Sequence, residues 1–258
     1  MLVETQYGTF FVHKTGTGKR TLVMLHGLGS AGTTFAKIWP DLQDYNLVVP
    51  DLLGFGRSTV SGTFSYSFLD QAQSVLQLLD HLNLDTLSLL GHSMGGCVAM
   101  AVAHMDMARV EKLIVAEPNL IPTRALATPS ISARADKISE GDYVSRFPEI
   151  FSDFEPNKNG SISSRLYWDT LQQASPVAMY RVSQALLDLN EFDVWKAYNT
   201  CVNASFVGER SIEGIHVKLS LTGSVPIYQI AGAGHNMFVE NPHSCIKAIR
   251  QVLDGTKP

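Results

Sequence analysis

One pentapeptide restricts the possible folds of this chain more than any other feature: residues Gly91–Gly95, with the sequence GHSMG. It lies between an apolar run, Thr86–Leu90, and a stretch rich in Ala, Val and Met, Cys97–Met105. The run predicts a buried strand and the stretch a helix, so the pentapeptide forms a sharp strand-to-helix turn whose flanking glycines admit close contacts. The helix directs its amino end at Ser93, where its free N–H groups favour negative charge. Ser93 is therefore the candidate nucleophile, with a bare tight turn as the alternative.

Short apolar runs recur along the chain and alternate with helical patterns. This order is typical of a mainly parallel sheet with helices on both faces. The first residues predict a hairpin formed by Leu2–Gln6 and Thr9–Lys14. One helix is clearly marked, because Ser67 and Asp70 have the spacing of a capping box ahead of a helical apolar stripe. The buried strands are predicted at Thr21–Leu25, Leu47–Pro50, Thr86–Leu90, Lys112–Ala116, Val202–Val207 and Pro226–Ala231.

The region 119–200 interrupts this alternation. It contains five prolines and no convincing strand, and its part 141–198 holds ten of the 23 aromatic residues of the chain. We interpret it as a helical lid inserted into a core that comprises residues 1–118 and 201–258. The aromatic residues either pack the insertion onto the core or also line a substrate pocket.

A base and an oxyanion site are predicted at the ends of other strands. His235 follows the last apolar run and lies on a loop that can reach a serine on a neighbouring loop. The backbone N–H groups of Leu28 and Met94 are the candidate oxyanion hole. We interpret His26 as structural and His92 as a supporting residue near the site.

Composition narrows the possible partners. The net charge is −4, and no cluster of Lys or Arg is long enough to follow a phosphate backbone, which argues against nucleic acid. Three cysteines without paired or metal-type spacing argue against a disulfide framework and for a reducing compartment. No apolar stretch approaches the roughly 20 residues of a membrane span, and no signal-peptide pattern is present. We expect a cytoplasmic protein without a metal site that acts on a small molecule, in an oligomeric state that stays open.

Four motifs together give the chain a family resemblance. They are His26–Gly29, Asp51–Ser58, Gly91–Gly96 and Gly234–Pro242, and they extend over nearly the whole chain. In this order and spacing the chain resembles the α/β-hydrolase family. The resemblance implies an eight-stranded, mostly parallel sheet with helices on both faces and a lid after the sixth strand. It also implies that no metal or organic cofactor takes part.

The acid that orients the histidine departs from the usual pattern of this family. Many relatives carry an aspartate in a Gly-Glu-x-Asp-like turn after the seventh strand, whereas this chain has serine at that place, Ser211. Glu117 directly follows the sixth predicted strand, an arrangement that resembles some haloalkane-dehalogenase-like relatives. We favour Glu117 as the acid. Glu209, another carboxylate or none are the alternatives, and Glu117 could instead support the hinge of the lid.

These residues predict acyl transfer to water. Ser93 would attack a carbonyl after His235 removes its proton, and a small to medium carboxylic ester with an apolar acyl part is the expected substrate. Two alternatives stay open. The same triad could cleave a carbon–carbon bond or act as a cofactor-free perhydrolase, or the protein could be a receptor of this fold that turns over slowly or not at all.

Overall fold

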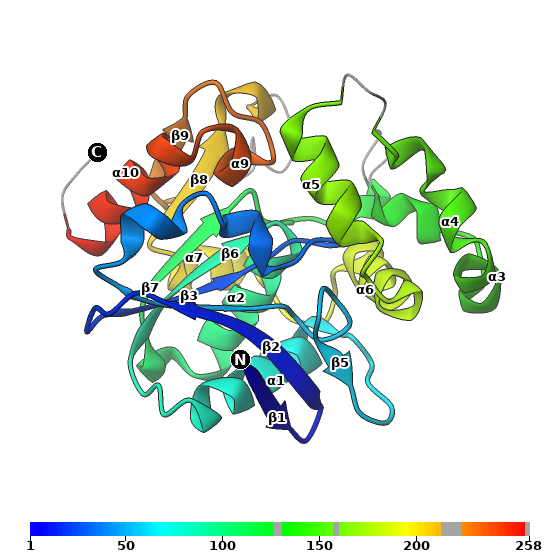
Figure 1. Ribbon diagram of the computed structural model, residues 1–258, viewed down its shortest axis with the longest axis horizontal. Coiled ribbons are helices and arrows are strands. Elements are labelled where there is room, and N and C mark those ends of the chain that lie inside the picture. Colours follow the sequence, from blue (N-terminus) through cyan, green and yellow to red (C-terminus); the bar gives the residue numbers. More distant parts are fainter. Residues whose placement is uncertain (126–130, 157–159, 213–222, 256–258) are drawn as a thin grey trace.

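A central sheet organises the computed structural model, which describes residues 1–125, 131–156, 160–212 and 223–255 (Figure 1). Its strand order is β1-β2-β4-β3-β6-β7-β8-β9, and β5 pairs with β2. The pairs β4–β3, β3–β6, β6–β7, β7–β8 and β8–β9 are parallel. The pairs β1–β2, β2–β4 and β2–β5 are antiparallel. The strands are β1 (Leu2–Thr5), β2 (Gly8–Thr15), β3 (Thr21–Leu25), β4 (Asn46–Pro50), β5 (Thr59–Val60), β6 (Leu87–His92), β7 (Val110–Ala116), β8 (Ala204–Gly208) and β9 (Ile227–Ile230).

This sheet confirms the predicted architecture, with nine strands among the described residues in place of eight and with strand ends that differ from the predicted ones by up to two residues. The two-residue strand β5 was not predicted, because so short a segment has no readable periodicity. The predicted strand Val202–Val207 begins at Ala204, because helix α7 continues to Cys201 and its C-cap is Val202.

Helices cover both faces of the sheet. Alternate side chains of β3 enter two separate apolar clusters: Val23 and Leu25 face the cluster under α1 and α2, and Leu22 and Met24 face the cluster under α9 and α10. Figure 1 shows these helix pairs on opposite faces of the sheet. The helices are α1 (Phe68–His81), α2 (Met94–Met105), α3 (Glu140–Ser145), α4 (Phe147–Ile150), α5 (Ile162–Leu171), α6 (Pro176–Asp188), α7 (Val194–Cys201), α9 (Met237–Glu240) and α10 (Pro242–Leu253).

The start of α1 is capped as predicted. The hydroxyl of Ser67 accepts the N–H of Asp70 at 3.0 Å, which satisfies one of the free donors of the first turn. The return contact differs from a simple capping box. The hydroxyl of Ser65 bridges Ser67 and Asp70: it donates to the carboxylate of Asp70 and accepts the N–H of Ser67 at 3.0 Å.

The helices of the region 119–200 separate into two groups. Figure 1 shows α3, α4, α5 and α6 together at one side of the sheet, whereas α7 packs against α2. Backbone contacts connect the first group to the core, for example the N–H of Ser175, which donates to the carbonyl of Gly54 at 2.8 Å. The parts 126–130 and 157–159 of this region lie outside the described residues.

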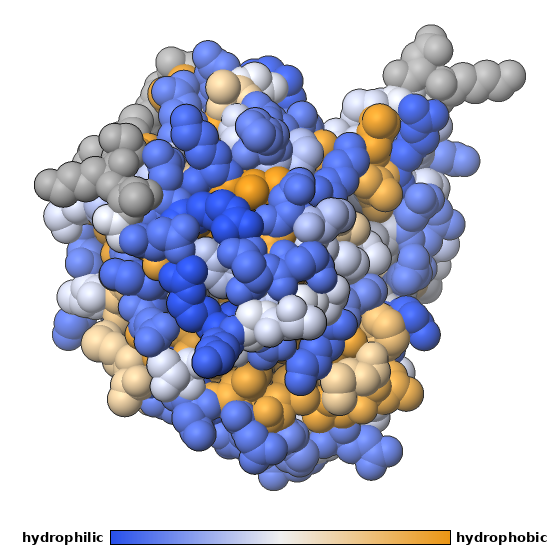
Figure 2. All heavy atoms as spheres, turned by 60° about the vertical axis from the view of Figure 1, so that its left-hand side comes forward, coloured by the Kyte–Doolittle hydropathy of each residue, from blue (hydrophilic) through white to orange (hydrophobic). Residues whose placement is uncertain are grey.

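Figure 2 shows one face of the molecular surface, coloured by hydropathy. Hydrophilic residues predominate on the face shown in Figure 2, and apolar residues gather mainly in its lower part. Cys97, Cys201 and Cys245 are all free thiols in the structure. Among the described helices none is long and apolar enough to cross a membrane.

Candidate active site

Ser93 occupies a strained turn between β6 and α2. Its backbone has φ 54° and ψ −122°, a conformation that costs a non-glycine residue about 1–3 kcal/mol. The close contacts of the turn explain its glycines. A Cβ on Gly91 would lie 2.3 Å from the carbonyl oxygen of Gly95, and a Cβ on Gly95 would lie 2.3 Å from that of Leu25. The predicted strand–turn–helix context of Ser93 is therefore confirmed.

His235 and Glu117 are joined by a short hydrogen bond. The Nδ1 atom of the histidine lies 2.7 Å from Oε2 of the glutamate. The other oxygen of Glu117 accepts the N–H of Gly208 at 2.9 Å, and the nearby hydroxyl of Ser211 also acts to lower the pKa of this carboxylate. Burial acts to raise the pKa of Glu117, but the bond and charge of His235, together with the two other groups, outweigh it and hold that pKa below its ordinary value. Glu117 is therefore a carboxylate at neutral pH.

The strands β7 and β8 are neighbours, so a carboxylate after either strand could lie close to the histidine. They are parallel, so residues that follow them meet at the same edge of the sheet. Glu117 follows β7 and reaches His235, while Ser211, at the place where relatives carry an aspartate, supports the same carboxylate. Glu209 points elsewhere, because its carboxylate accepts the N–H of Gly232 at 2.6 Å. The geometry therefore favours Glu117 over Glu209 as the partner of the histidine.

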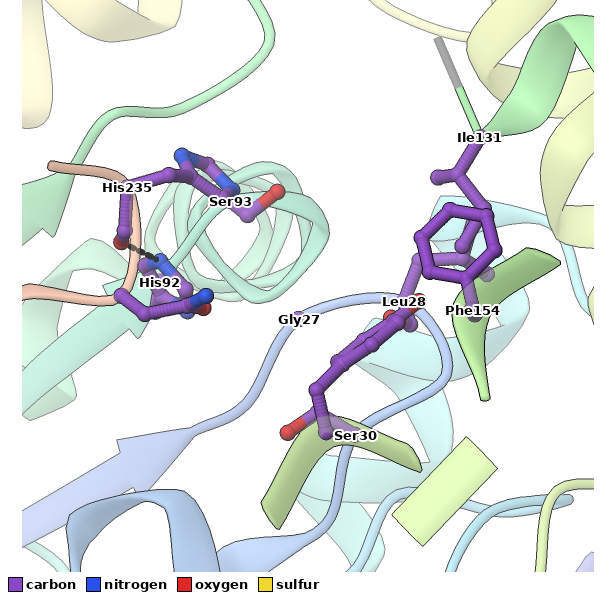
Figure 3. A pocket seen from close by; sticks show the side chains of 10 residues that line it. Gly27, Leu28, Ser30, His92, Ser93, Ile131, Phe154 and His235 are labelled. Carbon is purple, nitrogen blue, oxygen red and sulfur yellow. Dashed lines mark hydrogen bonds between the residues drawn. The ribbon is translucent and has the colours of Figure 1, made fainter. Parts of the chain in front are cut away.

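Ser93 and His235 line one pocket of about 280 Å³. Figure 3 shows the ring of His235 beside Ser93, whose hydroxyl faces the open space. Within the part of the chain that the structure describes, this hydroxyl makes no hydrogen bond, which leaves its oxygen accessible to a substrate. The lining residues are Gly27, Leu28, Ser30, His92, Ser93, Ile131, Phe154, Tyr167, His235 and Asn236.

The two amides predicted for the oxyanion hole are both unoccupied donors. Met94 is the first residue of α2 and so has no acceptor within the helix, and among the described residues neither its N–H nor that of Leu28 donates a hydrogen bond. His26 lies behind this loop. Its Nε2 accepts the N–H of Leu52 at 2.9 Å, so its Nδ1 carries the proton and donates to the carbonyl of Gly27 at 2.9 Å. Burial lowers the pKa of His26 and keeps the ring neutral, in agreement with a structural part.

His92 supports the loop that carries the candidate base. Its Nε2 donates to the backbone carbonyl of His235 at 2.8 Å (dashed line in Figure 3), and the two rings lie 4.7 Å apart between centroids. Burial lowers the pKa of His92 to about 3, so the ring stays neutral. The sequence indicated a supporting residue here, but the bond to a residue 143 positions away has no local signal.

Other chemistry finds little support at this site. Burial raises the pKa of Cys97 and of Cys245 to about 12, so neither thiol supplies the thiolate that a cysteine nucleophile needs. Among the described residues no group of three or more His, Cys, Asp or Glu is arranged to hold a metal ion.

Comparisons with known proteins agree with the fold. The family model described as alpha/beta hydrolase fold matches residues 20–200. The uncharacterized hydrolase YugF of Bacillus subtilis is 38% identical over 95 residues, which are 36% of this chain and 35% of that protein. Esterase YbfF of Escherichia coli is 23% identical over 240 residues, or 90% of this chain and 92% of that protein. A thermophilic esterase from Thermogutta terrifontis superposes over 100% of both chains with a TM-score of 0.81 and 21% identity.

The chain belongs to the α/β-hydrolase fold family. The family model covers most of the chain, and the structural likeness extends to its full length. The chain spans about a third of the length of the first curated relative that it matches, so that match shows a local similarity and no more.

The position of the acid yields a test with a matched control. We expect Glu117→Gln to lower kcat by up to about 10⁴-fold, because the neutral amide no longer holds the tautomer of His235 or stabilises its charged form. Glu209→Gln, on the adjacent strand end, should stay within a few-fold of wild type. Steady-state ester hydrolysis measures both. Loss of activity in the Glu209 variant alone would move the acid to the later loop.

The lowered pKa of Glu117 also predicts how stability depends on pH. Since the folded protein binds this proton more weakly than the unfolded chain, the carboxylate stabilises the fold above its ordinary pKa of 4.5, and that contribution disappears as pH falls through the lower folded value. Urea unfolding at a series of pH values below 5 should therefore show a shallower loss of stability for Glu117→Gln than for wild type. Glu209→Gln should keep the wild-type slope, and equal slopes for all three proteins would contradict the interpretation.

Proposed function

We propose that the protein is a serine hydrolase that cleaves small to medium carboxylic esters through an acyl-enzyme on Ser93. One observation carries the proposal: the 2.7 Å bond between Nδ1 of His235 and Glu117, in a ring that shares a pocket with Ser93. A carboxylate that accepts the Nδ1 proton leaves the lone pair on Nε2, the nitrogen that a general base uses. Membership of a family whose members include esterases supports the same reaction class.

The reaction follows from these groups. Nε2 of His235 takes the proton of Ser93 while the serine oxygen attacks the ester carbonyl, and the N–H groups of Leu28 and Met94 stabilise the oxyanion. The imidazolium, held by Glu117, returns the proton to the leaving alcohol, which departs and leaves an acyl-enzyme. Water activated by the same histidine then releases the acid and restores Ser93.

The pocket favours an uncharged substrate of modest size. Its volume of about 280 Å³ is at the small end of ligand pockets. Its apolar walls come from Leu28, Ile131, Phe154 and Tyr167, and apart from the histidines no ionisable side chain other than that of Tyr167 belongs to the described lining. An apolar acyl group fits such walls, whereas a carboxylate or ammonium would meet no opposite charge there.

The insertion 119–200 takes the part of a lid in this proposal, between the core segments 1–118 and 201–258. Three of the pocket residues, Ile131, Phe154 and Tyr167, come from it, so aromatic residues of the insertion line the pocket as well as packing it onto the core. In this proposal α5 and the segments around Ile131 and Phe154 cover the pocket, and α7 stays with the core layer beside α2.

A fluorophosphonate probe tests the nucleophile. Wild type should be labelled covalently, Ser93→Ala should not, and Ser30→Ala, which changes another serine of the same pocket, should still be labelled. We expect Ser93→Ala to lower kcat by about 10⁶-fold, the size of effect known for a serine nucleophile. The readouts are mass spectrometry of the adduct and hydrolysis of nitrophenyl esters.

A substrate panel then separates the reaction classes. Nitrophenyl esters from acetate to decanoate should be cleaved with a preference for short acyl chains, and diketones and peroxide-dependent reactions should be slow. Labelling without ester turnover would favour carbon–carbon hydrolysis or perhydrolysis. If the wild-type protein neither reacts with the probe nor cleaves any member of the panel, the proposal that it is an enzyme is refuted.

A further inference from the structure

Helix α5 of the insertion binds two successive carbonyl groups of the loop 26–30, here called the oxyanion loop because it carries the candidate amide of Leu28. The hydroxyl of Tyr167 donates to the carbonyl of Leu28 at 3.2 Å. One turn later, the hydroxyl of Thr170 donates to the carbonyl of Gly29 at 3.1 Å and shares its proton with the carbonyl of Tyr167 at 2.9 Å. Two side chains on one face of a helix therefore bind consecutive peptide groups of a loop about 140 residues away.

The preceding carbonyl is held from the core side. The oxygen of Gly27 accepts the N–H of Ser30 at 3.2 Å and Nδ1–H of His26 at 2.9 Å. All three carbonyl groups of the segment 27–29 thus have donors, while the N–H of Leu28 has no acceptor among the described residues.

Gly29 shows how closely α5 rests on this loop. A Cβ there would lie 2.7 Å from the hydroxyl oxygen of Tyr167 and 2.9 Å from Cδ1 of Leu171, and the backbone has φ +69°. Thr170 is buried at 7% exposure, so its bond to the loop is shielded from water. The seat of α5 is therefore a packed contact as well as a pair of hydrogen bonds.

The orientation of these carbonyl groups decides the field beside Ser93. In a trans peptide the C=O of one residue and the N–H of the next point in opposite directions, so the held carbonyls of Leu28 and Gly29 fix the amides of Gly29 and Ser30. The N–H of Ser30 in turn donates to the carbonyl of Gly27, which shares its peptide group with the N–H of Leu28. A carbonyl that turned toward the pocket would place negative potential where an oxyanion has to be stabilised, and preorganised donors lose their effect once they can rotate.

We propose that Tyr167 and Thr170 are positioning residues for the oxyanion hole: from the insertion they hold the two peptide groups that follow Leu28, and through the bond from the Ser30 N–H to the Gly27 carbonyl they keep the Leu28 N–H turned toward the reacting carbonyl. The proposal rests on the function proposed above for this site. Neither hydroxyl touches the reacting atoms. Their contribution lies in the transition state, because the tetrahedral oxyanion depends on the loop more than the ground-state ester does.

The variants Tyr167→Phe and Thr170→Val remove each hydroxyl and keep the shape of the side chain. We expect kcat for a short nitrophenyl ester to fall about tenfold in each and up to about 100-fold in the double variant, with KM little changed. Affinity for a boronic acid transition-state analogue should fall in parallel with kcat/KM, while affinity for an apolar ground-state inhibitor stays constant. Thr170→Ser, which restores a hydroxyl, should recover activity.

The matched control is Tyr180→Phe, which removes a hydroxyl that stays inside the insertion and donates to the carbonyl of Ile138 at 3.0 Å. It should leave kcat unchanged. Hydrogen exchange gives a second readout that needs no turnover: protection of the Ser30 amide, which reports on the loop, should decrease in the double variant and stay constant in Tyr180→Phe.

The outcomes separate the two proposals. An inactive wild type with a loosened loop in the double variant would refute the proposed function and leave the mechanical contact intact. An active wild type whose double variant keeps both kcat and loop protection would overturn the positioning role. A double variant that changes KM alone, or loses activity only in proportion to its melting temperature, would overturn it as well.

Discussion

The start of α2 lies so close to the sheet that only glycine fits at position 95. A Cβ there would lie 2.3 Å from the carbonyl oxygen of Leu25 and 2.5 Å from that of His26. This contact places the amino end of α2, with Met94, directly against the end of β3, where the loop that carries Leu28 begins. Ser93, at the amino end of α2, therefore faces that loop, and the remaining parts of the site only have to reach this point.

Two of the candidate site residues are among the described non-glycine residues with a positive φ. Ser93 and Glu117 both have positive φ, 54° and 44°, although neither is glycine. Each is held by a backbone bond to the adjacent strand: the N–H of Ser93 donates to the carbonyl of Ala116, and that of Glu117 to the carbonyl of Phe206. Such conformations persist when the surroundings determine them, and here parallel neighbours in the sheet do so. The rigid sheet thus presents both side chains at one edge.

Local patterns predicted the core of this fold, and contacts between distant segments did not follow from them. The buried strands and the cap at Ser67 have signals within a few residues, so they were predictable to within one or two positions. The family motifs placed Ser93 and His235 on neighbouring loops. The bond from His235 to Glu117 and the contact of Tyr167 with the carbonyl of Leu28 join segments that lie far apart in the chain. No single-sequence periodicity encodes such pairs.

The ring of His92 under that of His235 has a consequence for charge. Two solvated imidazoles in contact would take up protons over the same interval and repel each other once both were charged. Burial removes one of them from this competition, since His92 stays neutral down to about pH 3. The two tilted rings together therefore carry at most one positive charge in any ordinary solution. The neutral ring of His92 adds no charge beside His235, so the electrostatic field that a substrate meets changes by the charge of a single proton.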